Sequence, residues 1–319
     1  MKEIQRVACV GAGLIGQGWA TVFAAKGCTV VLHDLTDRLL DEALRHIAQN
    51  LDFLEAHHLL KTAGAAEAKG RILATTRLSD AVEQVDYVQE SAPDRYEIKE
   101  PLFEAIDRAA PREAILASSS SGLLMTEIQK GTGRPERCVM AHPMLPVHLV
   151  PTVEVVGGEK TSRDTVVAAC EFLEKMGKAP VLLKKEVSGY IVNRLQAALL
   201  REAIDLVDKG VASAEDVDRA FCMGNGLRDP VIGPLMRAHL AGDGIARFLE
   251  DYAESYRLRW ESMECWTSLS ASAVRAVTES VNEMGMVRTQ GLEEIKVWRD
   301  EMLVKILQVV ERPCVAATT

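Results

Sequence analysis

The segment from Val7 to Asp34 constrains the fold more than any other part of the chain. It contains an apolar run, a GxGxxG motif, a stretch of helical periodicity and a second apolar run, in that order. The glycines of the motif are Gly11, Gly13 and Gly16. This order predicts strand, tight turn, helix and strand, which is the βαβ unit that begins a parallel sheet with helices on its faces.

Within such a unit, the spacing of the glycines is typical of a dinucleotide-binding turn. Gly11 allows the tight turn, and Gly13 has no side chain to hold a pyrophosphate away from the backbone. Gly16 lets the helix pack close to its strand. The helix begins around Leu14 and Ile15, so its N-terminus and its free N–H groups face the phosphates. We expect these five residues to contact a dinucleotide cofactor.

Asp34 ends the second predicted strand, eighteen residues after Gly16. A carboxylate at this place accepts hydrogen bonds from the hydroxyls of the adenosine ribose and repels a 2′-phosphate. No Arg directly follows it, so NAD is expected rather than NADP. The alternative is a glycine-rich turn in an ordinary βαβ unit.

The rest of the 319-residue chain falls into two parts. Up to residue 186, strands alternate with helical stretches, which predicts a doubly wound (Rossmann) α/β fold with a parallel sheet. From residue 187 the patterns are only helical, with long helices expected at 191–209, 245–260, 270–284 and 292–310. We therefore expect a sheet domain over 1–186 and a smaller all-α domain over 187–319.

Composition and charge argue against several classes of protein. The formal net charge of −9 disfavours nucleic acid and anionic membranes as partners. No apolar run approaches the length of a membrane span, and the N-terminal residues enter the first strand directly, which leaves no room for a targeting peptide. The seven cysteines are scattered without a CxxC pair, as expected for reduced thiols, and no metal site is expected. These features predict a soluble, cytoplasmic protein.

His142 and Glu154 form the most informative pair of polar residues. His142 ends a predicted strand, and Glu154 stands among valines in the next one, where burying a carboxylate is costly unless it is paired. An imidazole held by a carboxylate is a general base, because the carboxylate fixes its tautomer and stabilises the imidazolium. The alternative is a solvent-facing Glu on an edge strand and an ordinary loop His.

Two further polar residues are candidates for binding a reacting oxygen. Ser121 closes a run of four serines after a buried strand, and Asn193 lies in the first helix of the helical part. Each is able to hydrogen-bond an oxygen of a substrate. Each is also of a type that commonly caps a helix or bonds to a helix backbone.

The chain resembles the 3-hydroxyacyl-CoA dehydrogenase family over essentially its full length. Within the family it is similar to the branch that acts on free acids, which includes lambda-crystallin/L-gulonate 3-dehydrogenase and L-carnitine dehydrogenase. The segments that carry the resemblance are GAGLIGQGWA, QESAPDRYEIK, SSSSGLL, AHPMLPVHLVPTVEVVGGEKTS, KKEVSGYIVNRLQ, GLRDPVIGPL and WRDEMLVKI.

The resemblance implies roles for individual residues. His142 matches the catalytic base and Glu154 its orienting partner, while Ser121 and Asn193 match the groups that hydrogen-bond the substrate oxygen. Gly11, Gly13, Gly16 and Asp34 match the NAD site of the family.

Lys99 and Asp94 also match the NAD site, although the family usually has Glu at the latter position. The family commonly has Asn three residues after the catalytic His, where this chain has Leu145. A homodimer formed through the helical domain is also implied, in keeping with the apolar face of the predicted helix 191–209.

These observations predict an NAD-dependent oxidoreductase that oxidises the 3-hydroxyl of a small hydroxy acid, such as L-gulonate. Alternatives are a 3-hydroxyacyl-CoA dehydrogenase, an L-carnitine dehydrogenase and, in a different class, a crystallin-like protein that binds NAD without catalysis. In acyl-CoA members a Ser and a Lys help to hold CoA, and the matching positions here are Asn50 and His57. Arg228 resembles an Arg of the free-acid branch and would grip a substrate carboxylate. Its alternative is a surface ion pair with Asp229.

Overall fold

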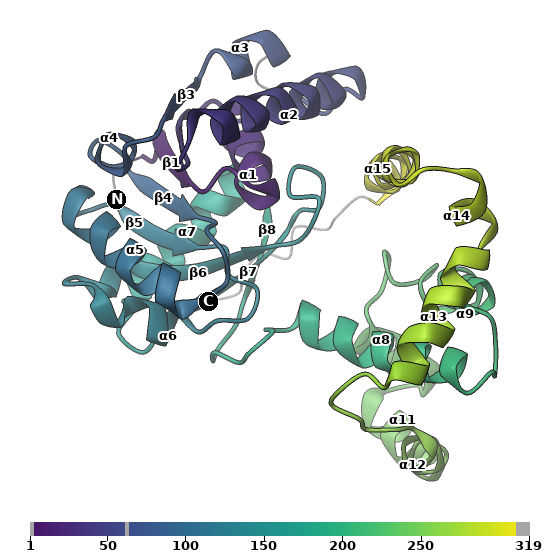
Figure 1. Ribbon diagram of the computed structural model, residues 1–319. Coiled ribbons are helices and arrows are strands. Elements are labelled where there is room, and N and C mark those ends of the chain that lie inside the picture. The colour runs from purple at the N-terminus through teal and green to yellow at the C-terminus, as the bar shows by residue number, and fades with distance from the viewer. Residues whose placement is uncertain (1–2, 61–63, 311–319) are drawn as a thin grey trace. The chain divides into compact units, whose positions relative to one another are not determined.

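The computed structural model describes residues 3–60 and 64–310. The chain divides into two compact units, and the division falls between Arg194 and Leu195. The first unit contains a sheet with helices on both faces, and the second is helical (Figure 1). The predicted fold class is thereby confirmed. The boundary expected from the sequence lies a few residues earlier, at 186.

The first unit is built on an eight-stranded sheet with the strand order β3-β2-β1-β4-β5-β6-β7-β8. Its strands are β1 Arg6–Val10, β2 Thr29–His33, β3 Ile72–Thr75, β4 Tyr87–Glu90, β5 Ile115–Ser118, β6 Cys138–Pro143, β7 Thr152–Gly157 and β8 Ala179–Leu182. Neighbouring strands are parallel except β6 and β7, which run antiparallel.

The sheet is parallel as expected, except that β7 runs antiparallel to β6. Two neighbouring parallel strands need a crossover of about a dozen residues or more. Residues 144–151, which join β6 to β7, are too few for it. As a consequence, the chain turns back directly, and β7 pairs with residues 139–143 of β6.

Helices cover both faces of the sheet, and a buried apolar cluster lies under each layer. One layer contains α1 Leu14–Ala25, α2 Asp37–Ala56, α3 Ala65–Lys69 and α7 Arg163–Lys175. The other contains α4 Leu78–Val82, α5 Tyr96–Ala109 and α6 Met125–Ile128, with short 3₁₀ turns at η1 Gln129–Gly131 and η2 Pro135–Arg137. The strands between them are apolar on both faces, as expected for a doubly covered sheet.

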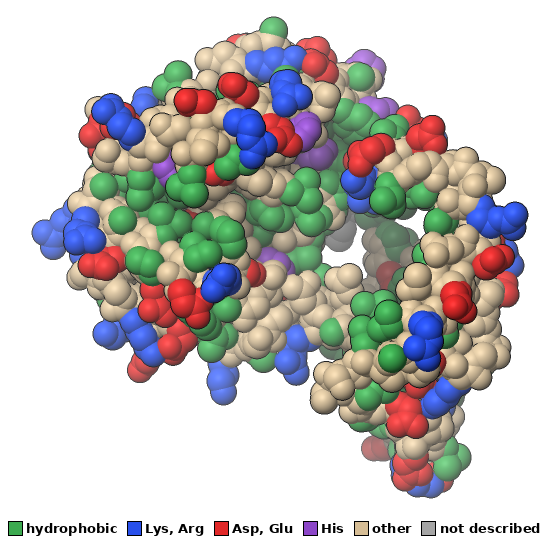
Figure 2. Space-filling model, viewed as in Figure 1, with side chains coloured by type: hydrophobic (Ala, Val, Ile, Leu, Met, Phe, Trp, Pro, Cys, Tyr) green, Lys and Arg blue, Asp and Glu red, His purple; other side chains and the backbone are tan. Residues whose placement is uncertain are grey.

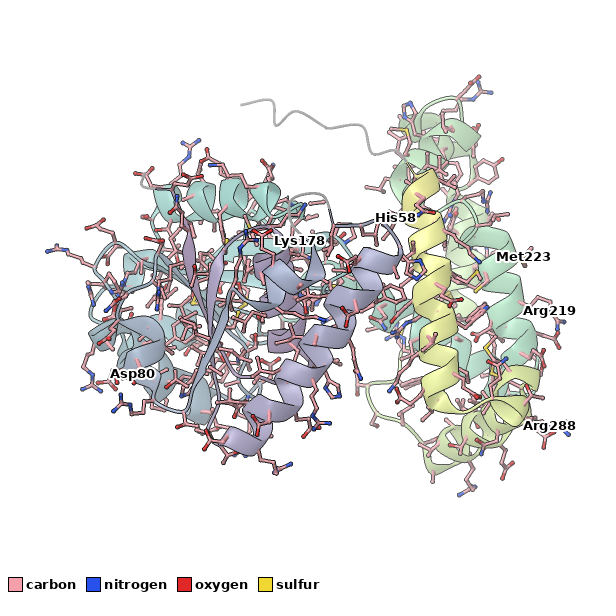
Figure 3. All side chains as sticks on the ribbon, turned by 90° about the horizontal axis from the view of Figure 1, so that it is seen from above. His58, Asp80, Lys178, Arg219, Met223 and Arg288 are labelled. Atoms are coloured by element: carbon pink, nitrogen blue, oxygen red, sulfur yellow. The ribbon has the colours of Figure 1, made fainter. Side chains whose placement is uncertain are left out.

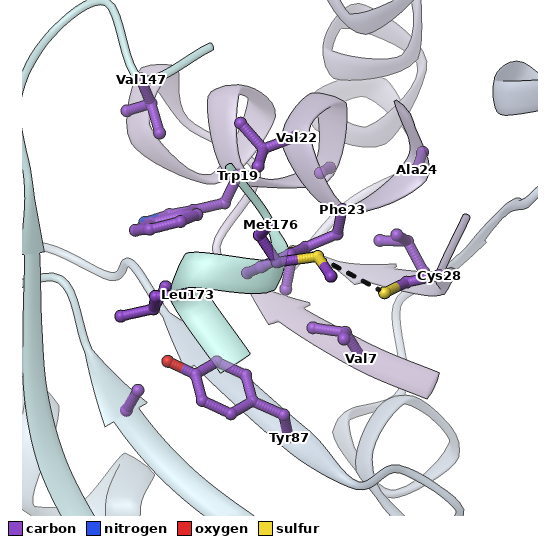
Figure 4. Packing of buried hydrophobic residues seen from close by; sticks show 14 of the residues in the cluster. Val7, Trp19, Val22, Phe23, Ala24, Cys28, Tyr87, Val147, Leu173 and Met176 are labelled. Carbon is purple, nitrogen blue, oxygen red and sulfur yellow. Dashed lines mark hydrogen bonds between the residues drawn. The ribbon is translucent and has the colours of Figure 1, made fainter. Parts of the chain in front are cut away.

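Aromatic rings form the centre of the cluster under α1. Trp19 and Phe23 of α1 stack with ring centroids 5.2 Å apart, and Phe23 stacks on Phe172 of α7 at 5.5 Å. Tyr87 of β4 contacts both phenylalanine rings from the sheet. Figure 4 shows Trp19, Phe23 and Tyr87 in this cluster. These large buried side chains anchor α1 on the sheet. The glycine-rich turn that precedes α1 is therefore fixed in position relative to the sheet.

The second unit begins within α8, a helix that spans Val192–Asp208. Its other helices are α9 Ala214–Ala220, η3 Phe221–Asn225, α10 Pro234–Ala241, α11 Ile245–Asp251, α12 Ala253–Ser262, α13 Ala271–Glu283, α14 Gly285–Thr289 and α15 Leu292–Val309. Arg219, Met223 and Arg288 mark α9, η3 and α14 in Figure 3. None of the described helices is long and apolar enough to cross a membrane.

Candidate active site

The glycine-rich turn lies between the ends of β1 and β4. Gly11 has a φ of +97°, which disfavours any residue with a side chain, and a Cβ there would come within 2.8 Å of the carbonyl group of Ser91. A Cβ on Gly16 would lie 1.8 Å from the carbonyl oxygen of Gly11, so the helix and the turn touch. Gly13 differs, because a Cβ at that position meets nothing within 4 Å. The space beside Gly13 is open on the side where a pyrophosphate would lie.

Asp34 closes this site from the end of β2. Its Oδ2 accepts a hydrogen bond from the amide of Ala12 at 2.7 Å, and its Oδ1 accepts one from the amide of Leu35, also at 2.7 Å. An ionised carboxylate has about four lone-pair sites, so both oxygens retain capacity for ribose hydroxyls. The turn, the exposed start of α1 at Leu14 and the carboxylate together form the donor and acceptor set that a dinucleotide needs.

His142 and Glu154 face each other across the antiparallel pair β6–β7. The Nδ1 of His142 lies 2.9 Å from Oε2 of Glu154, and the two residues are 4% and 1% exposed. The other oxygen, Oε1, accepts hydrogen bonds from the amides of Ile191 and Val192, at 2.7 and 2.9 Å. Glu154 therefore lies at the N-terminus of α8, where the helix dipole favours a negative charge.

The environment of Glu154 keeps it ionised. Burial by itself raises the pKa of this carboxyl, but the hydrogen bonds from His142 and from the two amides outweigh it, and the pKa lies below its ordinary value. A carboxylate only accepts hydrogen bonds, so Nδ1 of His142 carries a hydrogen. In the neutral imidazole the Nε2 is then left as a proton acceptor. The alternative of a solvent-facing Glu on an edge strand is excluded, because β7 lies between β6 and β8.

Ser121 and Asn193 also come together in the structure. The Nδ2 of Asn193 donates to the carbonyl oxygen of Ser121 at 3.2 Å. The amide and the hydroxyl of Ser121 both donate to Oδ2 of Asp94, each at 2.8 Å. Burial raises the pKa of Asp94, but hydrogen bonds from Ser121 and Ser120 and the charge of Lys99 outweigh this effect. The pKa lies below its ordinary value, so this carboxyl is ionised. The hydroxyl proton of Ser121 is therefore directed to Asp94.

Lys99 has a buried partner that the sequence did not reveal. Its Nζ contacts both carboxylate oxygens of Glu90, at 2.7 and 2.9 Å, and lies 3.6 Å from Asp94. Ser118 donates to the same carboxylate at 2.7 Å. The one available signal was a Glu at the end of an apolar strand, directly before the segment that contains Asp94 and Lys99. The Lys99–Glu90 pair fixes the loop after β4, and this loop places Asp94 beside Ser121.

Arg228 belongs to the second unit, in the segment between η3 and α10. It donates to the side-chain oxygen of Asn225 at 2.8 Å. Asp229 is instead paired with Arg237, at 2.7 Å, so the alternative of an Arg228–Asp229 ion pair does not hold. In the first unit, Leu145 is half exposed in the connection between β6 and β7. Among the described residues there is no group of three or more His, Cys, Asp or Glu that could hold a metal ion.

Comparisons with known proteins identify the family of the chain. The family model for the 3-hydroxyacyl-CoA dehydrogenase NAD binding domain matches residues 6–187, and that for the C-terminal domain matches 189–280. An L-carnitine dehydrogenase of Oceanobacillus iheyensis is 36% identical over 97% of this chain and 99% of its own. The lambda-crystallin of Oryctolagus cuniculus is 32% identical over 95% of each.

Among solved structures, an NAD⁺-dependent dismutase, 5-formyl-3-hydroxy-2-methylpyridine 4-carboxylic acid 5-dehydrogenase, superposes with a TM-score of 0.80 at 29% identity, covering 96% of this chain and 97% of that one. The (S)-3-hydroxybutyryl-CoA dehydrogenase of Ralstonia eutropha gives 0.65 at 31% identity, covering 80% and 89%. This chain belongs to the 3-hydroxyacyl-CoA dehydrogenase family and is an NAD-dependent oxidoreductase that acts on CH–OH groups.

Proposed function

We propose that this protein oxidises the 3-hydroxyl group of a small, free 3-hydroxy carboxylate, with His142 as general base. The observation that carries the proposal is the hydrogen bond between Nδ1 of His142 and the ionised Glu154. It leaves Nε2 as the atom that receives a proton. When bound, NAD supplies the acceptor for the hydride that leaves the substrate carbon.

Residues of the chain perform the proton transfer and bind the substrate oxygen. Nε2 of His142 takes the proton of the substrate hydroxyl, and Glu154 stabilises the imidazolium that forms. One hydrogen of the Asn193 amide is used by Ser121, and the second is available to the charge that develops on the substrate oxygen. Ser121 donates its hydroxyl proton to Asp94, so it has none left for the substrate oxygen; its carbonyl oxygen instead orients the Asn193 amide toward that oxygen.

The free acid is preferred over a CoA thioester for two reasons. At the positions where acyl-CoA members use Ser and Lys, Asn50 bonds to Thr21 of α1, and the ring of His57 packs on Phe53. Neither position has the Lys that would contact a CoA phosphate. Arg228 carries a positive charge with no carboxylate partner among the described residues, and a guanidinium binds a carboxylate with two parallel hydrogen bonds.

L-Carnitine is the second candidate, because several relatives 34–36% identical to the chain bear the name L-carnitine dehydrogenase. It falls in the same chemical class, since it is a 3-hydroxy carboxylate. It also carries a quaternary ammonium, which proteins commonly bind with aromatic rings. Residues 143–148, which follow His142, contain no Phe, Tyr or Trp, so we place L-gulonate-like acids first.

The test is NADH formation with L-gulonate, L-carnitine, 3-hydroxybutyrate and 3-hydroxybutyryl-CoA. We expect turnover of free acids and little of the thioester. Turnover of the thioester alone would overturn the proposal, and NADH binding without turnover of any member would identify a non-catalytic, crystallin-like protein.

Arg228→Met tests the carboxylate contact. We expect KM for the preferred acid to rise about 10- to 100-fold, since hydrogen bonds to charged groups contribute about 1.5–3 kcal/mol. Arg237→Met is the matched control, because that Arg is engaged by Asp229. Equal KM values for Arg228→Met and the unmodified protein would show that Arg228 does not bind the substrate carboxylate.

A further inference from the structure

Five side chains near the glycine-rich turn form a polar chain, of which four are buried and Ser91 is partly exposed: Trp19, Tyr87, Gln89, Ser91 and Ser119. The hydroxyl of Tyr87 lies 2.9 Å from Oε1 of Gln89, and Nε2 of Gln89 lies 2.8 Å from Oγ of Ser119. Nε1 of Trp19 is 3.1 Å from the same Oγ, and Oγ of Ser91 is 2.9 Å from it. Figure 4 shows Trp19 and Tyr87 within the apolar cluster under α1.

The orientation of the Gln89 amide follows from its neighbours. Its Nε2 also lies 3.4 Å from the carbonyl oxygen of Ala141, the residue before His142. If the amide were flipped, two oxygens that only accept would face each other there. Gln89 therefore donates to Ser119 and accepts from Tyr87.

The hydroxyl of Ser119 then has a single possible direction. A hydroxyl oxygen accepts two hydrogen bonds and donates one. Ser119 accepts from the indole N–H of Trp19 and from the amide of Gln89, and neither of these groups is able to accept in return. Its own proton goes to the remaining neighbour, Oγ of Ser91.

Ser91 is thus left with a proton to donate. Within the described part of the chain its Oγ has one hydrogen-bond partner, Ser119, toward which it is the acceptor. Its backbone closes the glycine-rich turn, with the amide donating to Val10 at 2.7 Å and the carbonyl group under Gly11. Its Cβ lies 3.8 Å from the position of a Cβ on Gly16. The free proton is therefore at the end of β4, beside the turn that faces the dinucleotide.

We propose that Ser91 is a cofactor-binding residue, whose hydroxyl donates to an oxygen of the pyrophosphate or of the nicotinamide ribose. Ser119 holds it as a donor, because the Ser119 proton occupies its acceptor side. The dinucleotide supplies the acceptor, because its pyrophosphate and its nicotinamide ribose both carry oxygens that accept hydrogen bonds.

The test compares Ser91→Ala with the unmodified protein by measuring the Kd of four ligands in the absence of substrate: NADH, ADP-ribose, ADP and AMP. We expect the Kd of NADH and of ADP-ribose to rise about three- to tenfold, as for one lost neutral hydrogen bond. AMP, which lacks both candidate groups, should bind unchanged. Weaker ADP binding identifies the pyrophosphate as the acceptor, whereas unchanged ADP binding identifies the ribose.

Tyr87→Phe is the matched control, because it removes a hydroxyl from the other end of the same polar chain. Its NADH affinity should stay within about twofold of the unmodified protein, with thermal unfolding of both apo-variants recorded in parallel. Ser91→Cys, which keeps the volume but donates weakly, should follow Ser91→Ala even if that variant folds poorly. The proposal is overturned if both Ser91 variants bind NADH as tightly as the unmodified protein. It is also overturned if Tyr87→Phe weakens NADH binding as much as Ser91→Ala does, or if Ser91→Ala weakens AMP binding as much as NADH binding. None of these outcomes bears on the identity of the substrate.

Discussion

At the scale of single residues, the chemistry of the site depends on which atoms carry protons. Glu154→Gln tests this directly, because an amide nearly preserves the shape but removes the charge that stabilises a histidinium. The amide is also able to donate to Nδ1 and so to favour the wrong tautomer of His142. We expect kcat to fall on the order of 10²-fold or more, with the Kd of NADH unchanged. Steady-state kinetics and NADH titration measure the two, and unchanged kcat would contradict a general base at His142.

The lowered pKa of Glu154 also predicts how stability depends on pH. The folded-state pKa lies below the ordinary value of 4.5, so the carboxylate stabilises the fold fully above that value. The contribution is lost as the pH falls through the lower, folded-state pKa. In acid titrations followed by circular dichroism, Glu154→Gln should therefore lose less stability than the unmodified protein below about pH 5. Equal losses of stability in the two proteins would show that Glu154 does not contribute to the pH dependence of stability.

Part of this site could be predicted from the sequence. A carboxylate among Val153, Val155 and Val156 signals a buried partner, because an unpaired charge there is too costly. The direction of the Ser121 hydroxyl could not be predicted, since it depends on Asp94 from the loop of another strand. Local pattern carries no information about contacts between segments that only the sheet order brings together.

At the scale of elements, two glycines of the turn serve different purposes: Gly16 allows close packing, and Gly13 leaves space for the cofactor. A methyl group on Gly16 would collide with the backbone of Gly11, whereas one on Gly13 meets no protein atom. Gly16→Ala should therefore lower both thermal stability, by about 1–3 kcal/mol for an overpacked site, and NADH affinity. Gly13→Ala should leave the melting temperature unchanged and weaken NADH alone, because its methyl group enters the space of the pyrophosphate. Thermal unfolding and NADH titration of both variants check this, and a destabilised Gly13→Ala would contradict it.

Elements with a strong local signal were predictable, and breaks without one were not. The strand–turn–helix–strand of residues 7–34 was confirmed because apolar runs and glycines mark each change. The single helix expected at 245–260 was wrong, since α11 ends at Asp251 and α12 begins at Ala253. The rings of Phe248, Tyr252 and Tyr256 continue a four-residue spacing through the break, and Phe248 contacts both tyrosines, so the periodicity conceals the break.

At the scale of the whole molecule, the second unit has little core of its own. Its buried apolar residues in the described part of the chain are Ala214, Ala273 and Val304, all small or medium in size. Large apolar side chains are exposed on it, including Leu195 and Leu199 of α8, and such side chains show among the charged ones in Figure 2. A helical unit that buries so little gains stability by covering this surface.

We propose that a second copy of the chain covers the apolar side chains of α8. Leu195 and Leu199 lie on successive turns of one helix face and are 59% and 46% exposed, so each would gain stability by losing contact with water. Sedimentation of the unmodified protein at micromolar concentration should give a dimer, and Leu195→Glu/Leu199→Glu should give monomer by placing unpaired charges in the contact. Val167→Glu, at a valine of α7 that is 43% exposed in the first unit, is the matched control and should stay dimeric. A monomeric unmodified protein excludes the dimer, and a dimeric double variant places the contact on another surface.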